Sequence, residues 1–295
     1  MLRTGICLTA IYPEAMFDKD KLIKAIKQTA KTGIFNGVEY YFEGKEEDYI
    51  EIRDLIKELD LYSVFLAGYP MKSNKIDISA RDETVRRKSV EDSFELIKRG
   101  MKLASDKVLI LSGPVWEKED RELLVSQSVK SIRELTNMNR DKADIPEISL
   151  EFFNNSGEPY LALGDFETIK LLCKDLSGIN FGITYDFSHA MQLGMDIKST
   201  VRELLPWIHH IHIANSVSKV KASPLYGDKH PLFGIENEDL SLDEVLYLLQ
   251  GFQKNDYLKN ISICSMEVIS RNDHSPEWYF EQTVNQARIL LSDFK

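Results

Sequence analysis

The chain has 295 residues, of which 43% are hydrophobic and 28% are charged, and both proportions are ordinary for a globular protein. A net charge of -10 disfavours a protein that binds bare nucleic acid, which would usually present a basic surface. Three cysteines without metal-knuckle spacing fit a reducing cytoplasm, and no apolar run approaches the roughly 20 residues of a membrane span. The first residues are also too polar for a secretion signal. We therefore expect a cytoplasmic protein with no nucleic-acid partner and no membrane partner.

Short apolar segments with strand periodicity alternate with amphipathic helical segments along the chain. In the first half, the expected strands are TGICLTA (4–10), GVEYYF (37–42), YSVFLAG (62–68) and KVLILSG (107–113). Each is followed by an expected helix, at 20–33, 48–61, 83–104 and 121–138. Gly33 closes the first of these helices, as glycine commonly does just beyond a helix end.

The same alternation continues through the second half. Its expected strands are EISLEFF (147–153), FGITYDF (181–187), IHHIHIAN (208–215) and ISICSMEVIS (261–270). Helices are expected at 166–176, at 197–207, over LSLDEVLYLLQGF (240–252) and after Ser275. Two of these starts carry specific signals, because Ser241 and Glu244 form a capping box and Pro276 occupies the favoured first helical position.

Eight strand–helix units predict an α/β protein of the (β/α)8 TIM-barrel class, formed as a single domain over residues 1–295. Such barrels typically need about 250 residues, and no linker or low-complexity tract interrupts this chain. The competing architecture is a doubly wound open sheet, which would place a glycine-rich phosphate turn after its first strand. The segment TGICLTAIYPE has no such turn, so we expect no nucleotide cofactor.

Each of the last four predicted strands carries one ionisable residue near its carboxyl end. The side chains of a strand alternate between its two faces, and the active site of a TIM barrel lies at the carboxyl ends of its strands. On every one of these strands the ionisable residue shares the polar face, opposite apolar residues that should pack against helices. The four residues predicted to point into the barrel are Glu151, Asp186, His212 and Glu267.

Three carboxylates that converge in a buried space would repel one another and take up protons, unless a cation lies between them. Oxygen-rich ligation with one imidazole suits a single divalent metal such as Mn, Mg, Co or Zn. Taken singly, Asp186 is better explained as a helix cap, a buried Glu as a member of an ion pair, and His212 as a structural histidine. Four such residues on successive strands, in matching register, favour the metal site.

Several segments of the chain resemble the xylose isomerase-like superfamily, which holds sugar isomerases, ketose 3-epimerases, inosose dehydratases and abasic-site endonucleases. The segments that carry the resemblance are SLEFFNN, TYDFSHAMQLG, HHIHIAN, GDKHPLFG and SMEVIS, and the resemblance extends over nearly the whole chain. It implies that Glu151, Asp186, His212 and Glu267 bind one divalent metal and that His189 contacts substrate. It also implies that Glu151 and Glu267 serve as the catalytic acid–base pair.

The activity implied by this resemblance is a metal-dependent isomerase or epimerase that acts on a small sugar or polyol. Its reaction would pass through an enediolate formed beside a carbonyl that the metal polarises. The first alternative is a keto-polyol dehydratase, because the same enediolate can expel a hydroxyl group. A non-catalytic sugar binder is a further alternative, since fold does not fix function. The oligomeric state stays open, a homo-oligomer included.

A second metal site is implied by the Asp-x-His motif formed by Asp228 and His230. Together with His189, these residues could hold a second metal, as in an endonuclease-like metallohydrolase. Against this, the endonucleases add histidines at strands three and four, where this chain reads FLAGYP and LSGPVW. A complete three-metal cluster is therefore not expected, and we prefer a loop-structuring role for the motif.

The candidates for further substrate contacts are weaker. Ketose 3-epimerases usually carry an arginine shortly after the histidine of strand seven, whereas this chain reads NSVSKVKA. Lys219 or Lys221 could take its place, although lysine does not reproduce the geometry of a guanidinium group. Trp116, after strand four, is a candidate for an apolar wall against a sugar face, and it could equally cover the barrel rim. Asn154 and Glu158 lie in a loop after strand five and are candidates to bind substrate hydroxyls. Ordinary loop polarity explains Asn154 and Glu158 equally well.

Overall fold

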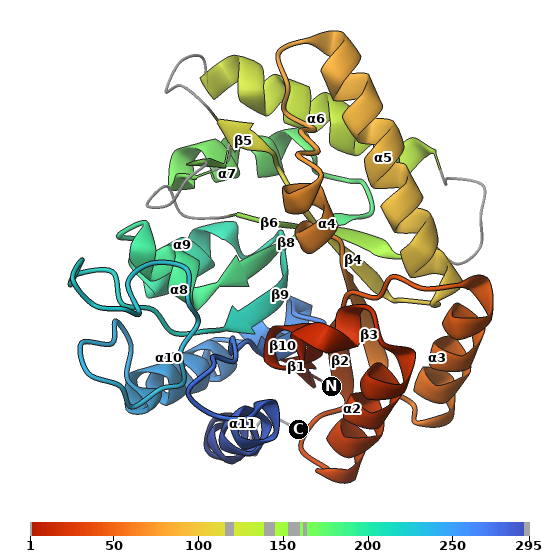
Figure 1. Ribbon diagram of the computed structural model, residues 1–295. Helices are drawn as coiled ribbons and strands as arrows, with labels where there is room; N and C mark the ends of the chain where they lie inside the picture. Colours follow the sequence, from red (N-terminus) through yellow and green to blue (C-terminus); the bar gives the residue numbers. More distant parts are fainter. Residues whose placement is uncertain (1, 116–120, 139–144, 153–159, 162–163, 292–295) are drawn as a thin grey trace.

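A computed structural model describes residues 2–115, 121–138, 145–152, 160–161 and 164–291 (Figure 1). Within these residues, eight parallel strands form a closed barrel in the order β1-β10-β9-β8-β6-β4-β3-β2. The strands follow one another around the barrel in their order along the chain, and β1 pairs with β10 to close it. This is the arrangement of a TIM barrel. The predicted fold class is confirmed.

The barrel strands are short, and all run in the same direction. They are β1 (Arg3–Cys7), β2 (Gly37–Tyr40), β3 (Tyr62–Leu66), β4 (Lys107–Leu111), β6 (Glu147–Glu151), β8 (Phe181–Asp186), β9 (Ile208–Ile213) and β10 (Ile263–Met266). A separate antiparallel pair joins β5 (Pro114–Val115) to β7 (Tyr160–Leu161).

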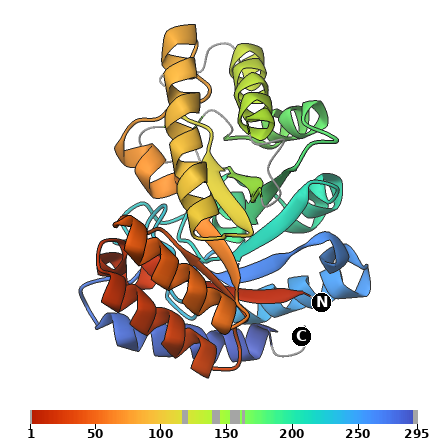
Figure 2. The ribbon, with the colours of Figure 1, turned by 90° about the vertical axis from the view of Figure 1, so that its right-hand side faces the viewer.

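Amphipathic helices cover the outside of the barrel, as two perpendicular views show (Figures 1 and 2). The long ones are α2 (Lys19–Lys31), α3 (Glu46–Glu58), α5 (Glu83–Lys102), α6 (Arg121–Asn137), α7 (Phe166–Asp175), α9 (Ile197–Leu204), α10 (Leu242–Lys254) and α11 (Pro276–Leu291). The predicted capping box is present, because the Ser241 hydroxyl accepts from the Glu244 amide while Glu244 accepts from the Ser241 amide. Across the described residues, no helix combines the length and the hydrophobicity that a bilayer crossing requires.

Short helices begin where three of the predicted strands were expected to continue. They are α1 (Leu8–Ile11), α4 (Gly68–Ser73) and α8 (Phe187–Gln192), and two 3-10 turns, η1 (Pro13–Met16) and η2 (Tyr257–Asn260), complete the connections. In each of these strands the apolar sequence continues beyond the last residue that hydrogen-bonds to a neighbouring strand, so the sequence predicts a strand that is too long. Beyond that point the chain turns, and its next polar residues come to lie over the mouth of the barrel.

On β6, β8 and β9 the strand register separates an outward apolar face from an inward polar face, as predicted. Asp186 pairs with His212 and Glu151 with Thr184, so these side chains lie on the same side of the sheet. The residues between them pack outward in the main core beneath the helices, and they include Leu150, Ile183, Tyr185, Ile211 and Met266. A smaller apolar cluster fills the barrel interior and consists of Val64, Leu109, Leu111 and Ile263.

Candidate metal centre

The four residues predicted as metal ligands meet at the carboxyl end of the barrel. Glu151 ends β6, Asp186 ends β8, His212 lies near the end of β9, and Glu267 directly follows β10. One potential ligand atom from each of them lies within 4.8 Å of the others. The strand alternation seen in the sequence therefore selected side chains that converge in space.

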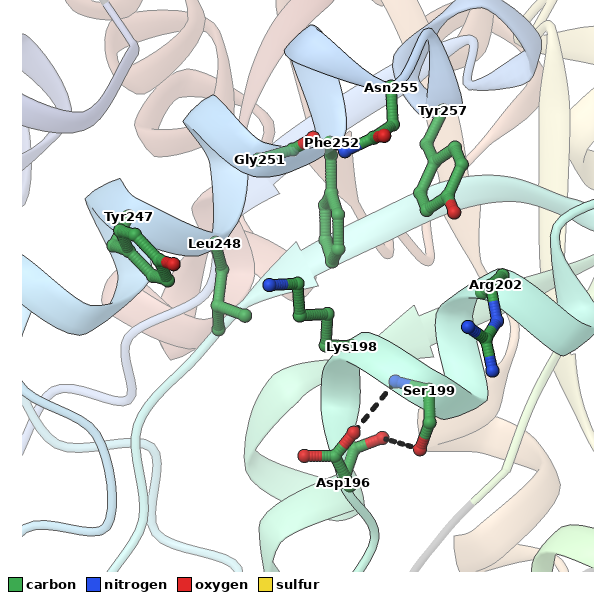
Figure 3. A pocket seen from close by; sticks show the side chains of 10 residues that line it. All are labelled: Asp196, Lys198, Ser199, Arg202, Tyr247, Leu248, Gly251, Phe252, Asn255 and Tyr257. Carbon is green, nitrogen blue, oxygen red and sulfur yellow. Dashed lines mark hydrogen bonds between the residues drawn. The ribbon is translucent and has the colours of Figure 1, made fainter.

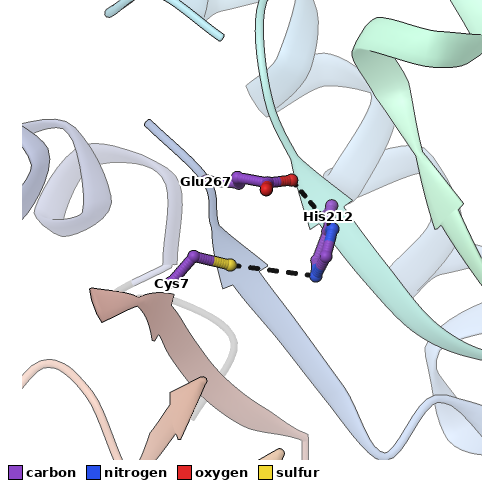
Figure 4. Close-up of side chains that lie close together, drawn as sticks. All are labelled: Cys7, His212 and Glu267. Carbon is purple, nitrogen blue, oxygen red and sulfur yellow. Dashed lines mark hydrogen bonds and ion pairs between the residues drawn. The ribbon is translucent and has the colours of Figure 1, made fainter. Parts of the chain in front are cut away.

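The His212 ring is the centre of this group. Its Nδ1 atom lies 2.9 Å from Glu151 Oε1, 2.9 Å from Glu267 Oε2 and 3.8 Å from Asp186 Oδ2. The opposite nitrogen, Nε2, lies 3.8 Å from the Cys7 thiol. Figure 4 shows the Glu267 carboxylate at one end of the ring and the Cys7 thiol at the other end. Three carboxylates thus surround a single ring nitrogen.

Asp186 contributes to the site and to the local fold at the same time. Its Oδ1 atom accepts a hydrogen bond of 2.8 Å from the backbone N–H of His189 and caps α8. Its Oδ2 atom is buried and has no hydrogen-bond partner among the described residues. A buried carboxylate oxygen without a partner is costly, and a bound cation would satisfy it. From the sequence, helix cap and metal ligand were alternative roles for Asp186. Because its two carboxylate oxygens have different surroundings, Asp186 can serve in both roles.

The donor set fits a divalent metal. Three carboxylates and one imidazole supply oxygen and nitrogen donors of the kind that Mn, Mg, Co and Zn accept. The site is closed to bulk water on most sides, because Glu151, Asp186 and His212 are at most 5% exposed. Glu151, Asp186, His212 and Glu267 are therefore the residues that would hold the ion.

Burial and neighbouring charges push the pKa values of the acids apart. Burial raises the pKa of Glu151 and that of Asp186 above their ordinary values. Burial also opposes ionisation of Glu267, but His212 and His230 outweigh it and lower the pKa of that carboxyl group. Burial likewise disfavours the charged form of His212, yet the surrounding acids, led by Glu267, raise its pKa well above the usual range. A metal that binds at Nδ1 must displace the proton held there.

Sequence reasoning missed a carboxylate beneath this cluster. Glu39 of β2 is fully buried inside the barrel. Its Oε1 atom lies 2.8 Å from His210 Nε2, and its Oε2 atom lies 3.0 Å from His212 Nε2. Burial opposes its ionisation, but the two histidines lower its pKa well below the ordinary range. The available signal was a single acid inside the otherwise apolar strand GVEYYF.

The residues predicted for a second metal also come together. One potential ligand atom from each of Asp186, His189 and His230 lies within 4.8 Å of the others. The rings of His189 and His230 meet edge to face at 5.2 Å, and Asp228 Oδ1 lies 2.8 Å from His230 Nε2. Burial opposes protonation of His230, but Glu267 and Asp228 raise its pKa to about 10. The Asp228–His230 pair also fits the loop-structuring role considered above.

A cavity of about 370 Å³ opens onto the metal candidates. Its ionisable lining residues include Glu151, His212, Asp228, His230 and Glu267. Its apolar and aromatic lining residues include Met16, Tyr41, Leu66, Tyr69, Leu109 and Leu111. Leu66 and Leu111 end β3 and β4, so leucines line the wall where the endonucleases were expected to add histidines. The volume lies within the range that holds small-molecule ligands.

The structure separates the predicted substrate residues. His189 is fully buried and does not line this cavity. The Lys219 side chain is 74% exposed, lies 3.8 Å from Asp239 and does not line the cavity either. Trp116, Asn154 and Glu158 lie outside the described residues.

A second hollow of about 410 Å³ lies on the outside of the barrel between α9 and α10 (Figure 3). Its lining includes Lys198, Arg202, Tyr247, Phe252 and Tyr257. Two hydrogen bonds join Asp196 to Ser199 and belong to the N-terminal cap of α9, and the Asn255 side chain donates to the Gly251 carbonyl at the end of α10. None of the metal candidates lines this hollow.

Comparison with solved structures shows the same barrel in several proteins. A D-tagatose 3-epimerase-like protein superposes with a TM-score of 0.72 at 17% identity, with 100% of both chains covered. An L-ribulose 3-epimerase has a TM-score of 0.72 at 17% identity and covers 100% of this chain and 93% of its own. The IOLI protein with a bound zinc atom has a TM-score of 0.71 at 16% identity, with 100% and 99% covered. At these identities the likeness shows the fold.

The family is shown by the sequence itself. Residues 26–278 match the family described as xylose isomerase-like TIM barrel, which is most of the chain. No curated protein matches the sequence closely enough to count as a relative. The barrel with a buried cluster of acids and histidines at its carboxyl end defines a class of candidate metal-dependent proteins. The chain belongs to the xylose isomerase-like TIM barrel family.

Proposed function

We propose that this protein is a metal-dependent sugar or polyol isomerase or epimerase that uses one divalent ion. The observation that carries the proposal is the pair formed by Glu151 and Glu267. Each places an oxygen 2.9 Å from His212 Nδ1, and their pKa values shift in opposite directions. Two acids whose surroundings separate their pKa values are suited to act as acid and base in one reaction.

The roles of the two glutamates follow from their surroundings. When bound, the metal would act as a Lewis acid that polarises a substrate carbonyl and its neighbouring hydroxyl group. Glu267, whose pKa is lowered, is the base that removes the proton from the carbon beside the carbonyl. Glu151 is the second acid–base group, which exchanges a proton with the resulting enediolate. Return to the opposite face gives epimerisation, and return to the neighbouring carbon gives isomerisation.

Two further observations support a sugar-sized substrate. The cavity beside the candidates has a volume of about 370 Å³ and is lined by both ionisable and apolar side chains. Two of the superposed proteins carry ketose 3-epimerase names, and a third carries a zinc atom. A dehydratase would use the same two glutamates, and the mass of the product distinguishes it, because loss of water changes mass and epimerisation does not.

The test is exchange of carbon-bound hydrogen. The protein is loaded with Mn²⁺, Mg²⁺, Co²⁺ or Zn²⁺ in deuterated water, and a panel of ketoses and keto-polyols is followed by proton NMR. We expect a metal-dependent loss of the signal of the hydrogen beside the carbonyl for at least one member of the panel. Glu151→Gln and Glu267→Gln should each reduce this rate by at least 100-fold, which is the size of a typical general acid–base contribution.

Glu147→Gln is the matched control for these variants. Glu147 lies on β6, four residues before Glu151, so the two side chains share one face of the strand. Glu147 is at the opposite end of the strand from the metal candidates. This variant should keep the exchange rate once it is folded and loaded with metal. Full activity in both active-site variants would overturn the acid–base assignment. Tight sugar binding without exchange across the panel would favour the non-catalytic binder.

A second candidate function is hydrolysis of phosphodiesters by an endonuclease-like site with two metals. The observation in its favour is the group of Asp186, His189 and His230, with Asp228 beside it. Elemental analysis of the metal-saturated protein distinguishes the two candidates. Two equivalents per chain, with one lost in His230→Asn, together with cleavage of abasic duplex DNA, would favour the hydrolase. One equivalent that persists in His230→Asn would favour the isomerase or epimerase.

A further inference from the structure

We propose that Glu39 is a positioning residue for the metal centre, which fixes the His212 ring so that Nδ1 presents its lone pair to the metal. The proposal rests on the metal site of the proposed function. It adds a residue from the opposite half of the chain, which neither the sequence analysis nor the comparisons assign to the site.

The geometry of the His212 ring carries the first step. Glu39 Oε2 lies 3.0 Å from Nε2, while Glu151 Oε1 and Glu267 Oε2 lie 2.9 Å from Nδ1. An ionised carboxylate can only accept hydrogen bonds, so Nε2 must carry the hydrogen that points to Glu39. A neutral imidazole has one N–H, and with that hydrogen on Nε2 the lone pair lies on Nδ1. When a metal displaces the second proton, which lies on Nδ1, the lone pair that it binds therefore faces the three predicted carboxylate ligands.

The only other group of the described chain recorded within reach of Nε2 is the Cys7 thiol. Its Sγ atom is 3.8 Å from Nε2, farther than the carboxylate oxygen, and a thiol sulfur is a weak acceptor. Figure 4 shows that Cys7 and Glu267 reach different ends of the ring. Glu39 is therefore the acceptor that orients the ring.

Glu39 is itself held in place by a hydrogen-bond chain through the barrel. Its Oε1 atom accepts from His210 Nε2 at 2.8 Å, and His210 Nδ1 lies 3.1 Å from the Thr184 hydroxyl. The Thr184 hydroxyl in turn lies 2.7 Å from that of Ser149. The chain links β2, β9, β8 and β6, so both oxygens of Glu39 have fixed partners. A histidine whose tautomer and ring orientation are fixed before binding binds metal more tightly than one whose ring is free to reorient.

The position of Glu39 makes this link specific to the closed barrel. In the barrel order, β2 is separated from β9 by β1 and β10. The Glu39 carboxylate on β2 therefore reaches the histidines of β9 across the barrel interior, and not from an adjacent strand. The residue is fully buried, and so are His210 and, almost completely, His212. A buried carboxylate is costly unless it is paired, and the two imidazoles are the partners that hold Glu39 ionised at this position.

The first test is calorimetric titration of the metal-free protein with Zn²⁺ or Mn²⁺. Glu39→Gln keeps the shape of the side chain but replaces one acceptor oxygen by an amide donor. Loss of such an outer hydrogen bond typically weakens metal binding 10- to 100-fold, and we expect a loss in that range. Glu147→Gln is the control, since it removes a carboxylate that faces His209 and Lys107 at the other end of the barrel, and it should keep the affinity of the wild type.

The second test reads the ring nitrogens of the wild-type protein directly. In the Zn²⁺-loaded wild type, long-range proton–nitrogen NMR reports which ring nitrogen of each histidine carries hydrogen, and His212→Asn identifies the signals of His212. We expect Nε2 of His212 to be protonated and Nδ1 to be the metal-bound nitrogen. Metal bound at Nε2, or a Glu39→Gln variant that binds metal as tightly as the wild type, would overturn the role of Glu39 and leave the proposed function standing. A wild type that binds no metal would overturn the proposed function as well.

Discussion

Asp186 caps the helix that carries His189. Its Oδ1 atom accepts the His189 backbone N–H at 2.8 Å, which leaves Oδ2 directed at the cluster around His212 Nδ1, 3.8 Å away. One carboxylate thus stabilises the turn from β8 to α8 and offers a ligand atom to the site. Because the two oxygens have different partners, the two tasks can be separated by substitution.

Asp186→Asn should separate them. Asparagine is as good an N-cap as aspartate, so the helix cap is kept, while the negative ligand is lost. We expect the metal-free variant to be at least as stable as the wild type, because one of three converging acids is removed, and its metal affinity to fall at least 10-fold. Asp186→Ala should in addition lose about 1 kcal/mol relative to Asp186→Asn through the missing cap. Urea denaturation and metal titration measure the two effects, and unchanged affinity in Asp186→Asn would remove Asp186 from the ligand set.

Acid sensitivity should arise at the other end of the barrel, from Glu147. This residue pairs with the fully buried Lys107 and lies 3.2 Å from His209 Nδ1. Burial opposes its ionisation, but His209 and Lys107 outweigh it and lower the pKa of Glu147 to about 2. The unfolded-state pKa is about 4.3, so the stabilisation is complete above that value and is lost as the pH falls towards 2.

Glu147→Gln should therefore lower the free energy of unfolding at pH 7 by about 3 kcal/mol, since it leaves a buried lysine without its carboxylate. Between about pH 5 and pH 3 its stability should change less steeply with pH than that of the wild type. Urea denaturation at a series of pH values measures both effects. Parallel pH profiles for the two proteins would show that Glu147 does not supply this part of the acid response.

Gly5 should be intolerant of a side chain. It pairs in register with Ser265, and a Cβ atom there would lie 2.2 Å from Ser265 Oγ and 2.7 Å from Ile263 Cδ1. Gly5→Ala should destabilise the protein by about 1–3 kcal/mol through overpacking, and Ser265→Gly in the same chain should recover part of the loss. Gly251→Ala is the control, because nothing lies within 4 Å of its Cβ on helix α10, and there alanine should stabilise by up to about 1 kcal/mol. Denaturation midpoints in urea compare the three variants, and a neutral Gly5→Ala would contradict the close contact.

Lys219 should be dispensable for catalysis, contrary to the role considered for it in the sequence. Its side chain is largely exposed and forms an ion pair of 3.8 Å with Asp239. Surface pairs of this kind contribute up to about 1 kcal/mol to stability. With any substrate found by the exchange screen, Lys219→Ala should change kcat/KM by less than about twofold. A rise in KM of tenfold or more would return Lys219 to the substrate site.

The fold and the four metal candidates could be predicted because they depend on local periodicity. Alternation along EISLEFF, FGITYDF and IHHIHIAN fixes which side chains share a face, and a closed parallel barrel leaves only two faces. Carboxyl-end positions on successive strands must then converge, as Glu151, Asp186 and His212 do. The strand ends were less predictable, because an apolar run continues past the last residue that a neighbouring strand can pair with.

Contacts across the barrel could not be predicted from the sequence. Glu39 meets His210 and His212 from 171 and 173 residues away, and no periodicity relates β2 to β9. Likewise, the exposure of Lys219 depends on how the loop after β9 folds back on Asp239. The sequence by itself determined the inward face of each strand, since alternation is a property of the extended backbone. Only the tertiary structure decided which inward residues touch, because barrel closure and side-chain reach set those distances.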